Sequence, residues 1–230
     1  MVIGSGMIAK RFDSFNEDNK FLIFASGVSN SKSINEPDYE RELKLLQDTI
    51  KNNMDKVFVY FSTCSIYDKE ERNSRYILHK KDAEHIIQSQ SSYYYIFRTS
   101  NVIGKSTNPN TVLNFFIYHI FNKINFDLWI NATRNLIDID DMYKIAAYII
   151  QKNIYPNQII NLANPVSYTT LEIIAAIEAL WNIKANYIQI AKGNPFTIDV
   201  SLLFPILKEL SISFKEDYLI NLLRKYYSDQ

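Results

Sequence analysis

Short apolar runs alternate with longer stretches of helical periodicity along the first half of this chain. Four runs have the length and apolar content of buried strands. They begin at Met1, Phe21, Val57 and Tyr94. The segments 38–53 and 76–90 place apolar residues on one helical face. Strands that alternate with helices in this order predict a parallel β-sheet with helical crossovers, which is an α/β fold.

Beyond Gly104 the hydrophobic pattern becomes less regular. A polar loop at 105–111 leads into a strongly apolar helix at 112–121, whose bulky residues suit a protein core better than a pocket wall. The remaining predicted strands lie at 126–130, 136–139, 159–162 and 187–190. The remaining predicted helices lie at 142–150, 171–181 and 216–227.

Composition narrows the class of protein. The chain has 230 residues, of which 47% are hydrophobic and 22% charged, enough for one buried core and a small additional lobe. Lys and Arg together number 25, as do Asp and Glu, so no basic surface predicts binding to nucleic acid. No apolar run approaches the roughly 18 residues that a membrane span needs. The single cysteine, Cys64, excludes an internal disulfide. Met1 opens directly into a strand-like run without a signal peptide, and we expect a cytoplasmic protein.

The first apolar run ends in a glycine-rich turn. Gly4-Ser-Gly6-Met-Ile-Ala9 has the Gly-x-Gly-x-x-Ala spacing of a dinucleotide-binding turn. In such a turn the first glycine allows a tight bend, and the second lets the backbone approach a pyrophosphate. We therefore assign Gly4, Gly6, Met7 and Ile8 to cofactor binding. A plain tight turn is the alternative.

A second polar segment follows the run at 21–25. Ala25, Ser26 and Gly27, with the loop through Ser31, lie at the carboxyl end of a predicted parallel strand. Ligands bind at this end of the strands in open α/β sheets. The alternative is an ordinary polar loop.

Candidate catalytic chemistry lies between Val57 and Lys80. Tyr76 and Lys80 are four residues apart on a predicted helix and therefore share a face. An ammonium beside a phenol lowers the tyrosine pKa, so that Tyr76 can exchange a proton near neutral pH. Thr63, at the end of the preceding strand, is placed to bind the same substrate oxygen. A chance Tyr-x-x-x-Lys is the alternative in a chain with 16 tyrosines.

Five segments along the chain form an ordered set of motifs. They are Phe61-Ser-Thr-Cys-Ser-Ile-Tyr67, Tyr76-Ile-Leu-His-Lys-Lys-Asp-Ala-Glu84, Phe97-Arg-Thr-Ser-Asn-Val-Ile-Gly104, Arg134-Asn-Leu-Ile-Asp-Ile-Asp-Asp141, and Ile160-Asn-Leu-Ala-Asn164 with Thr170-Leu-Glu-Ile. Together they resemble the extended short-chain dehydrogenase/reductase family, the NAD-dependent nucleotide-sugar epimerases, dehydratases and reductases.

This resemblance implies a Rossmann-type α/β fold, NAD or NADP as cofactor, and a nucleotide sugar as substrate. It implies that Tyr76 moves the hydroxyl proton, that Lys80 assists Tyr76 and holds the nicotinamide ribose, and that Thr63 orients the sugar oxygen. Ser62 joins the cofactor-binding residues, and the loop at 25–27 lines the nicotinamide side. The family's dehydratases carry an acidic pair where this chain has Cys64 and Ser65, which favours reduction or epimerisation.

Three substrate-binding residues are expected from the same motifs: Ser65, Asn101 and Arg134. A guanidinium binds phosphate oxygens bidentately, so Arg134 suits a substrate pyrophosphate. A surface salt bridge is the alternative for Arg134.

The resemblance also suggests the domain organisation. We expect a shortened dinucleotide-binding core at 1–104 and a substrate lobe at 105–230, with 137–150 and 159–164 returning to the core. The apolar stripes of the first two long helices predict a homodimer. A non-catalytic scaffold that binds dinucleotide or nucleotide sugar is the alternative function.

Two other groups of residues, three histidines and three aspartates, have simpler interpretations. His79, His85 and His119 lack metal-ligand spacing, so no metal site is expected. The acidic residues 138, 140 and 141 are typical of a helix N-cap that complements the helix dipole.

A segment of the family pattern is missing near the N-terminus. The family places two strands and a helix between the glycine-rich helix and the strand that here starts at Phe21. A Rossmann fold also expects an acidic residue about 20 residues after the glycines, to bind the adenosine ribose. Ala25, Ser26 and Gly27 occupy those positions. The sequence therefore predicts a weak adenosine half-site, unless basic residues clamp the 2′-phosphate of NADPH. The candidates are Lys10, Arg11 and Lys32.

Overall fold

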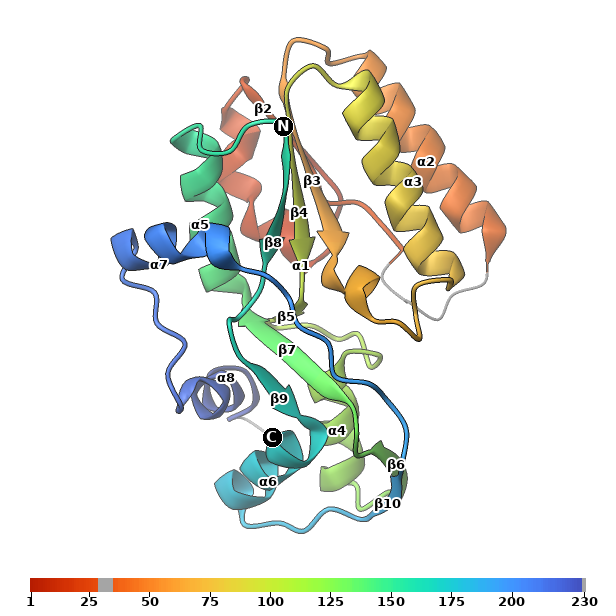
Figure 1. Ribbon diagram of the computed structural model, residues 1–230, viewed down its shortest axis with the longest axis vertical. Coiled ribbons are helices and arrows are strands. Elements are labelled where there is room, and N and C mark those ends of the chain that lie inside the picture. The colour runs from red at the N-terminus through yellow and green to blue at the C-terminus, as the bar shows by residue number, and fades with distance from the viewer. Residues whose placement is uncertain (29–34, 229–230) are drawn as a thin grey trace.

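The computed structural model describes residues 1–28 and 35–228, and it shows a layered α/β unit joined to a smaller lobe (Figure 1). Ser29, Asn30, Ser31 and Lys32, which belong to the predicted ligand loop and phosphate clamp, lie outside the described residues.

The large sheet has five strands in the order β1-β2-β3-β4-β8, and every pairing within it is parallel. This confirms the predicted Rossmann-type α/β fold. The strands are β1 (Val2–Ile3), β2 (Phe21–Phe24), β3 (Val57–Thr63), β4 (Tyr94–Thr99) and β8 (Gln158–Leu162).

Helices cover both faces of this sheet. Alternate side chains of a strand point to opposite faces, so β3 sends Phe58 and Tyr60 to one core cluster and Val59 and Phe61 to the other. The first cluster lies under α2 (Glu36–Lys51) and α3 (Arg75–Gln90). The second lies under three helices and a short 3₁₀ turn. These are α1 (Met7–Arg11), η1 (Asp13–Glu17), α5 (Ile139–Gln151) and α7 (Phe204–Glu209).

The smaller lobe has its own hydrophobic core beneath the carboxyl ends of the large sheet (Figure 1). Its strands are β5 (Asn101–Ile103), β7 (Thr133–Asp138) and β9 (Ser167–Thr169), with β6 (Phe126–Trp129) paired to β10 (Tyr187–Ile190). Its helices are α4 (Val112–Phe121), α6 (Thr170–Trp181) and α8 (Tyr218–Tyr227). The segment 137–150 ends β7 and forms α5 on the large sheet, and 159–164 contains most of β8.

Several short strands, helices and turns were not predicted from the sequence. The strands β5 and β9 have three residues each, too few to show a period of two. The helix α7 has six residues and begins with Phe204-Pro205, a proline in its first turn. Two short 3₁₀ turns, η2 (Cys64–Tyr67) and η3 (Ser201–Leu203), were also missed.

Strand β1 lies at the edge of the large sheet. It pairs with β2, and the described residues place no strand on its other side. The chain passes from α1 through η1 directly to β2. Within the described part of the chain, the sheet therefore lacks the strands that a full Rossmann fold places beyond its first strand.

Within residues 1–28 and 35–228, no helix has the length and apolar character needed to cross a bilayer. The same residues contain no group of three His, Cys, Asp or Glu side chains arranged to hold a metal ion.

Candidate active site

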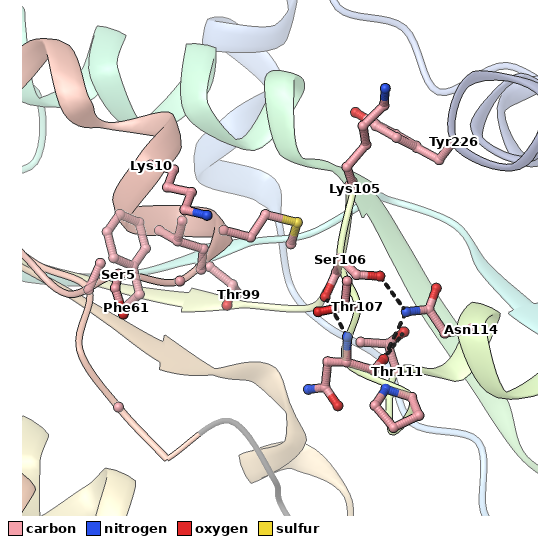
Figure 2. A pocket seen from close by; sticks show the side chains of 18 of the residues that line it. Ser5, Lys10, Phe61, Thr99, Lys105, Ser106, Thr107, Thr111, Asn114 and Tyr226 are labelled. Carbon is pink, nitrogen blue, oxygen red and sulfur yellow. Dashed lines mark hydrogen bonds between the residues drawn. The ribbon is translucent and has the colours of Figure 1, made fainter.

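A cavity of about 1180 Å³ opens at the carboxyl ends of the large sheet and extends into the smaller lobe (Figure 2). It brings together nine of the predicted cofactor and catalytic residues. These are Gly6, Met7, Ile8, Ala25, Ser26, Gly27, Ser62, Tyr76 and Lys80. Segments that are far apart in sequence thus meet where parallel sheets bind ligands.

The two glycines of the N-terminal turn have different roles. Gly4 has a φ of +128°, and a Cβ there would lie 2.5 Å from the carbonyl oxygen of Ala25. This position therefore needs glycine for its conformation and for its contact with the end of β2. A Cβ on Gly6 would meet no protein atom within 4 Å, so its backbone borders open space at the cavity. The turn therefore fits a dinucleotide phosphate that approaches the backbone closely.

Tyr76 and Lys80 lie on the first two turns of α3. The helix begins there because the side chain of Ser74 accepts a hydrogen bond from the backbone N–H of Ile77. Lys80 Nζ is 5.9 Å from the ring centroid of Tyr76, and both residues line the cavity. The predicted shared helix face is therefore present.

Lys80 is buried and has two further partners. Its Nζ donates to the hydroxyl of Tyr60 at 3.0 Å and lies 3.5 Å from Glu42 Oε1. Burial alone would lower the pKa of Lys80, but Tyr60, Tyr76 and Glu42 outweigh burial and raise that pKa above its ordinary value. Lys80 therefore stays protonated at neutral pH. The contact of Glu42 with Lys80 was not predicted, because in the sequence Glu42 is one of many charged residues on an amphipathic helix.

A second buried network fixes the end of β3. Ser62 Oγ donates to Glu84 Oε1 at 2.5 Å, and Arg98 donates to both oxygens of the same carboxylate. Arg98 also donates to the hydroxyl of Tyr67 at 3.0 Å, and that hydroxyl donates to Asn161 at 2.9 Å. The network ties α3, β3, β4 and β8 together beside the cavity.

Thr63 and Ser65 follow Ser62 in the chain, and unlike Ser62 they do not line the cavity. Thr63 is buried, and its Oγ1 accepts the backbone N–H of Ser65 at 3.1 Å, which caps η2. Between them, Cys64 is buried, and burial raises the pKa of its thiol to about 12.

Asn101 and Arg134 lie in the smaller lobe. Asn101 donates to the carbonyl of Asn135 at 2.9 Å, and Arg134 donates to the carbonyl of Thr133 at 2.9 Å. Burial lowers the pKa of Arg134, although Asp68 and Glu71 oppose the shift.

A second cavity of about 790 Å³ lies nearby, lined by Tyr67, Lys69, Thr133, Asn135 and the segment 194–198, among others. Gly4, Thr63, Ser65, Asn101 and Arg134 line neither cavity.

The chain matches a known family over most of the residues that form this site. Residues 24–163 match the model of the family described as NAD dependent epimerase/dehydratase. The chain belongs to this family. The predicted resemblance is thereby confirmed over more than half of the sequence.

Solved structures show the fold of the NAD dependent epimerase/dehydratase family in this chain. UDP-glucuronic acid 4-epimerase from Bacillus cereus, solved with UDP-glucuronic acid and NAD, has a TM-score of 0.71 at 17% identity, over 95% of this chain and 76% of the epimerase. TunA, an NDP-hexosamine 5,6-dehydratase of tunicamycin biosynthesis, has a TM-score of 0.72 at 16% identity, over 92% and 78%. RMD from Pseudomonas aeruginosa, complexed with NADPH, has a TM-score of 0.69 at 15% identity, over 91% and 81%. A sequence comparison with curated proteins gave no significant match.

The lobe side of the cavity was not predicted. It is formed by the loop 104–109, by α4 and by Tyr226 and Tyr227 of α8. Asn114 of α4 donates to the carbonyls of Ser106 and Asn108 at 2.9 and 2.8 Å, and Figure 2 shows this side chain facing the loop. Tyr227 in turn donates to Asn114 Oδ1 at 2.6 Å. The helix α4 thus contributes to the lobe core and to the cavity wall.

The acidic residues at the start of α5 cap that helix. Asp138 accepts the backbone N–H of Asp140 at 2.7 Å, which confirms the predicted N-cap. Lys225 of α8 donates to both Asp138 and Asp140 at 2.7 Å, so the same residues hold the C-terminal helix in place.

Proposed function

We propose that this chain is an NAD- or NADP-dependent reductase or epimerase of a nucleotide-linked sugar, with Tyr76 as the general acid and base. The observation that carries the proposal is the shared cavity. Tyr76, the charged Lys80 and the open backbone of Gly6 line one space at the carboxyl ends of parallel strands. The family to which the chain belongs is named for NAD-dependent chemistry.

The glycine-rich turn and the loop after β2 are the residues that would hold the cofactor. A bound nicotinamide dinucleotide accepts a hydride from a sugar carbon or returns one to it. Gly6, Met7 and Ile8 border the space for its phosphates, with Gly4 shaping the turn from behind. Ala25, Ser26 and Gly27 line the continuation toward Ser62 and Lys80.

Tyr76 would move the proton of the sugar hydroxyl. The phenol lies on the cavity wall, where a substrate hydroxyl reaches it. The ammonium of Lys80 lies 5.9 Å from the ring centroid, and both residues line the same cavity. Tyr76 would take this proton from the hydroxyl oxygen on the reacting sugar carbon, or return it there.

The substrate class follows the family and the similar structures, of which the Bacillus cereus epimerase was solved with UDP-glucuronic acid. Thr63 orients the sugar oxygen in this proposal, since its Oγ1 accepts from Ser65 N–H and its hydroxyl proton can be donated. By the same motifs the proposal assigns Ser65 and Asn101 to the sugar and Arg134 to a phosphate. Like Thr63, these three residues lie outside the lining of the cavity that Tyr76 faces. Cys64 and Ser65 stand where the family's dehydratases carry acids, which favours reduction or epimerisation over dehydration.

Turnover with a substrate panel tests this function. Purified protein is mixed with NADH or NADPH and nucleotide-linked 4-keto sugars to test reduction, and with NAD or NADP and UDP-, dTDP- and GDP-linked sugars to test epimerisation. Cofactor oxidation or sugar epimerisation, followed by absorbance and by NMR of the sugar, is the expected result. Cofactor binding without turnover on any sugar would contradict the proposal and favour a binding scaffold.

A homodimer is also proposed, through the helix pair α2 and α3. The apolar stripes that suggested this interface pack largely on the large sheet, with Leu46, Ile50, Ala83 and Ile87 in its core cluster. Leu45 of α2 and Leu78 of α3 remain 40% and 44% exposed for a partner. Light scattering at micromolar concentration checks the mass, and a monomer would contradict the dimer.

A further inference from the structure

A buried carboxylate lies behind the candidate catalytic lysine. Glu42 of α2 is 5% exposed, and its Oε1 is 3.5 Å from Lys80 Nζ. A buried acidic side chain carries a large desolvation cost unless charged or hydrogen-bonding partners offset it. The partners of Glu42 must therefore offset the cost of burying its charge.

The other oxygen of Glu42 has two partners. Oε2 accepts the backbone N–H of Val28 at 2.8 Å and lies 3.0 Å from Nε2 of the fully buried His79. One carboxylate thus joins the loop that follows β2 to two consecutive residues of α3. These contacts offset burial and lower the pKa of Glu42, so the group is an anion at neutral pH.

Gly27 covers the charged pair on the side of this loop. A Cβ on Gly27 would lie 3.2 Å from both Lys80 Nζ and Glu42 Oε1. The ammonium therefore lies between this backbone, the carboxylate and the Tyr60 hydroxyl, and the ring of Tyr76 lies at 5.9 Å. These contacts hold Nζ on this side, while Lys80 also lines the cavity.

We propose that Glu42 is a positioning residue for the Tyr76–Lys80 pair: its buried carboxylate keeps the Lys80 ammonium charged and fixed beneath the loop that follows β2. This role rests on the proposed function of Tyr76 as the proton-transferring group. Glu42 acts through Lys80 and the loop, and it does not line the cavity.

The charges around the pair determine the expected pH effect. Lys80 is faced by Glu42 from α2, by Tyr60 from β3 and by Tyr76 from its own helix.

Glu42 is also faced by His79 of α3, which in turn influences Glu36, and Glu36 is ion-paired with Arg75. Removal of the Glu42 charge removes the anion that favours protonated Lys80, so Lys80 then loses its proton at lower pH.

The test compares Glu42→Gln with Glu40→Gln, which makes the same change on an exposed position of the same helix. Lysine labelled with ¹³C reports the titration of Lys80, assigned through Lys80→Arg, without any substrate. We expect the Lys80 resonance to begin its change with rising pH at a lower pH in Glu42→Gln than in the wild type, and at the wild-type pH in Glu40→Gln. An unchanged Lys80 titration in Glu42→Gln would overturn the proposal.

Kinetics test the consequence for turnover. In Glu42→Gln we expect kcat to fall about 10-fold or more with a smaller change in KM, and the alkaline limb of the pH profile to move to lower pH. Glu42→Asp keeps the charge at a longer distance and should give intermediate values in both measurements. If Glu42→Gln does not fold, Glu42→Asp tests the proposal instead. Wild-type values for both measurements in Glu42→Asp would then overturn the proposal. An inactive wild-type enzyme would contradict the proposed function, while the titration would still decide whether Glu42 holds Lys80 charged.

Discussion

Arg98 of β4 donates two hydrogen bonds to the carboxylate of Glu84 of α3, from Nε to Oε1 at 2.9 Å and from Nη2 to Oε2 at 2.6 Å. The carboxylate is 5% exposed and the guanidinium 17%. Glu84 also accepts from Ser62, which lines the cavity. The pair therefore fixes the helix of Tyr76 and Lys80 relative to the end of β3.

Loss of this carboxylate should be costly. Glu84→Gln leaves the guanidinium of Arg98 largely buried without its counter-charge, and we expect a loss of about 3 kcal/mol in the free energy of unfolding. Asp48→Asn is the matched control, because Asp48 pairs with Lys44 on the exposed face of α2 and should change stability by less than about 1 kcal/mol. Urea unfolding measures both. Equal effects would contradict a structural role for the buried pair.

Tyr76→Phe should separate chemistry from binding. The variant keeps the ring and its packing but has no exchangeable proton, so we expect kcat to fall by roughly 10²–10⁴-fold. Cofactor affinity and the circular dichroism spectrum should stay close to those of the wild type. Tyr187→Phe, on β10 of the lobe and outside both cavities, is the control. Turnover of Tyr76→Phe within a few-fold of the wild type would refute the assignment.

The thiol of Cys64 should be inert in the folded protein. Cys64 is 1% exposed, and burial raises the pKa of its thiol from 9.0 to about 12. At about pH 8 a thiol reagent should react only after unfolding in urea, since the thiolate is the reactive form. Rapid labelling without denaturant would contradict the burial of Cys64.

The raised pKa of the Cys64 thiol also makes the stability of the protein depend on pH. The folded protein keeps the Cys64 proton at pH values where the unfolded chain loses it. The stabilisation is therefore complete below pH 9.0 and is lost as the pH rises toward about 12. Cys64→Ala removes this contribution, so its unfolding free energy should decline less steeply over that range. Parallel curves for the two proteins would contradict the raised pKa.

Periodicity and local spacing explain what could be predicted from the sequence. The apolar runs gave the parallel sheet because strands buried on both faces read as continuous hydrophobic segments. The Tyr76–Lys80 pair followed from helix geometry, since residues four apart share a face whatever surrounds them.

Contacts between distant segments explain what was missed. Glu42 and Lys80 are 38 positions apart, and only the packing of α2 on α3 turns an ordinary charged helix residue into a buried partner. Asn114 and Tyr227 are 113 positions apart, and their contact forms part of the lobe side of the cavity. Thr63 was placed in the site by its position at the end of β3 and by its motif, and the contact that its Oγ1 also makes, a cap on the turn that follows β3, was not predicted.

Cofactor affinity should reflect the edge position of β1. A Rossmann fold binds a dinucleotide across two mononucleotide halves, and its adenosine half lies on strands beyond the first. Here the described residues place β1 at the edge, and Ala25, Ser26 and Gly27 provide no carboxylate for the adenosine ribose. We therefore expect weak binding with little preference between NAD and NADP, and purified protein without bound dinucleotide. Calorimetry with both cofactors measures this, and submicromolar affinity for NAD would refute it.

A strong preference for NADPH would instead indicate a clamp for the 2′-phosphate. Arg11 is already engaged, because its Nε donates to Asp140 at 2.6 Å and its guanidinium stacks on Tyr143 at 3.8 Å. Lys10 is exposed and lines the cavity beside Gly6, so of the two described candidates, Lys10 and Arg11, it is the one that faces the space for that phosphate. In this case Lys10→Ala should weaken NADPH binding about 10-fold and leave NADH binding unchanged, since only NADPH carries the phosphate. Equal weakening of both cofactors would place Lys10 on the shared pyrophosphate instead.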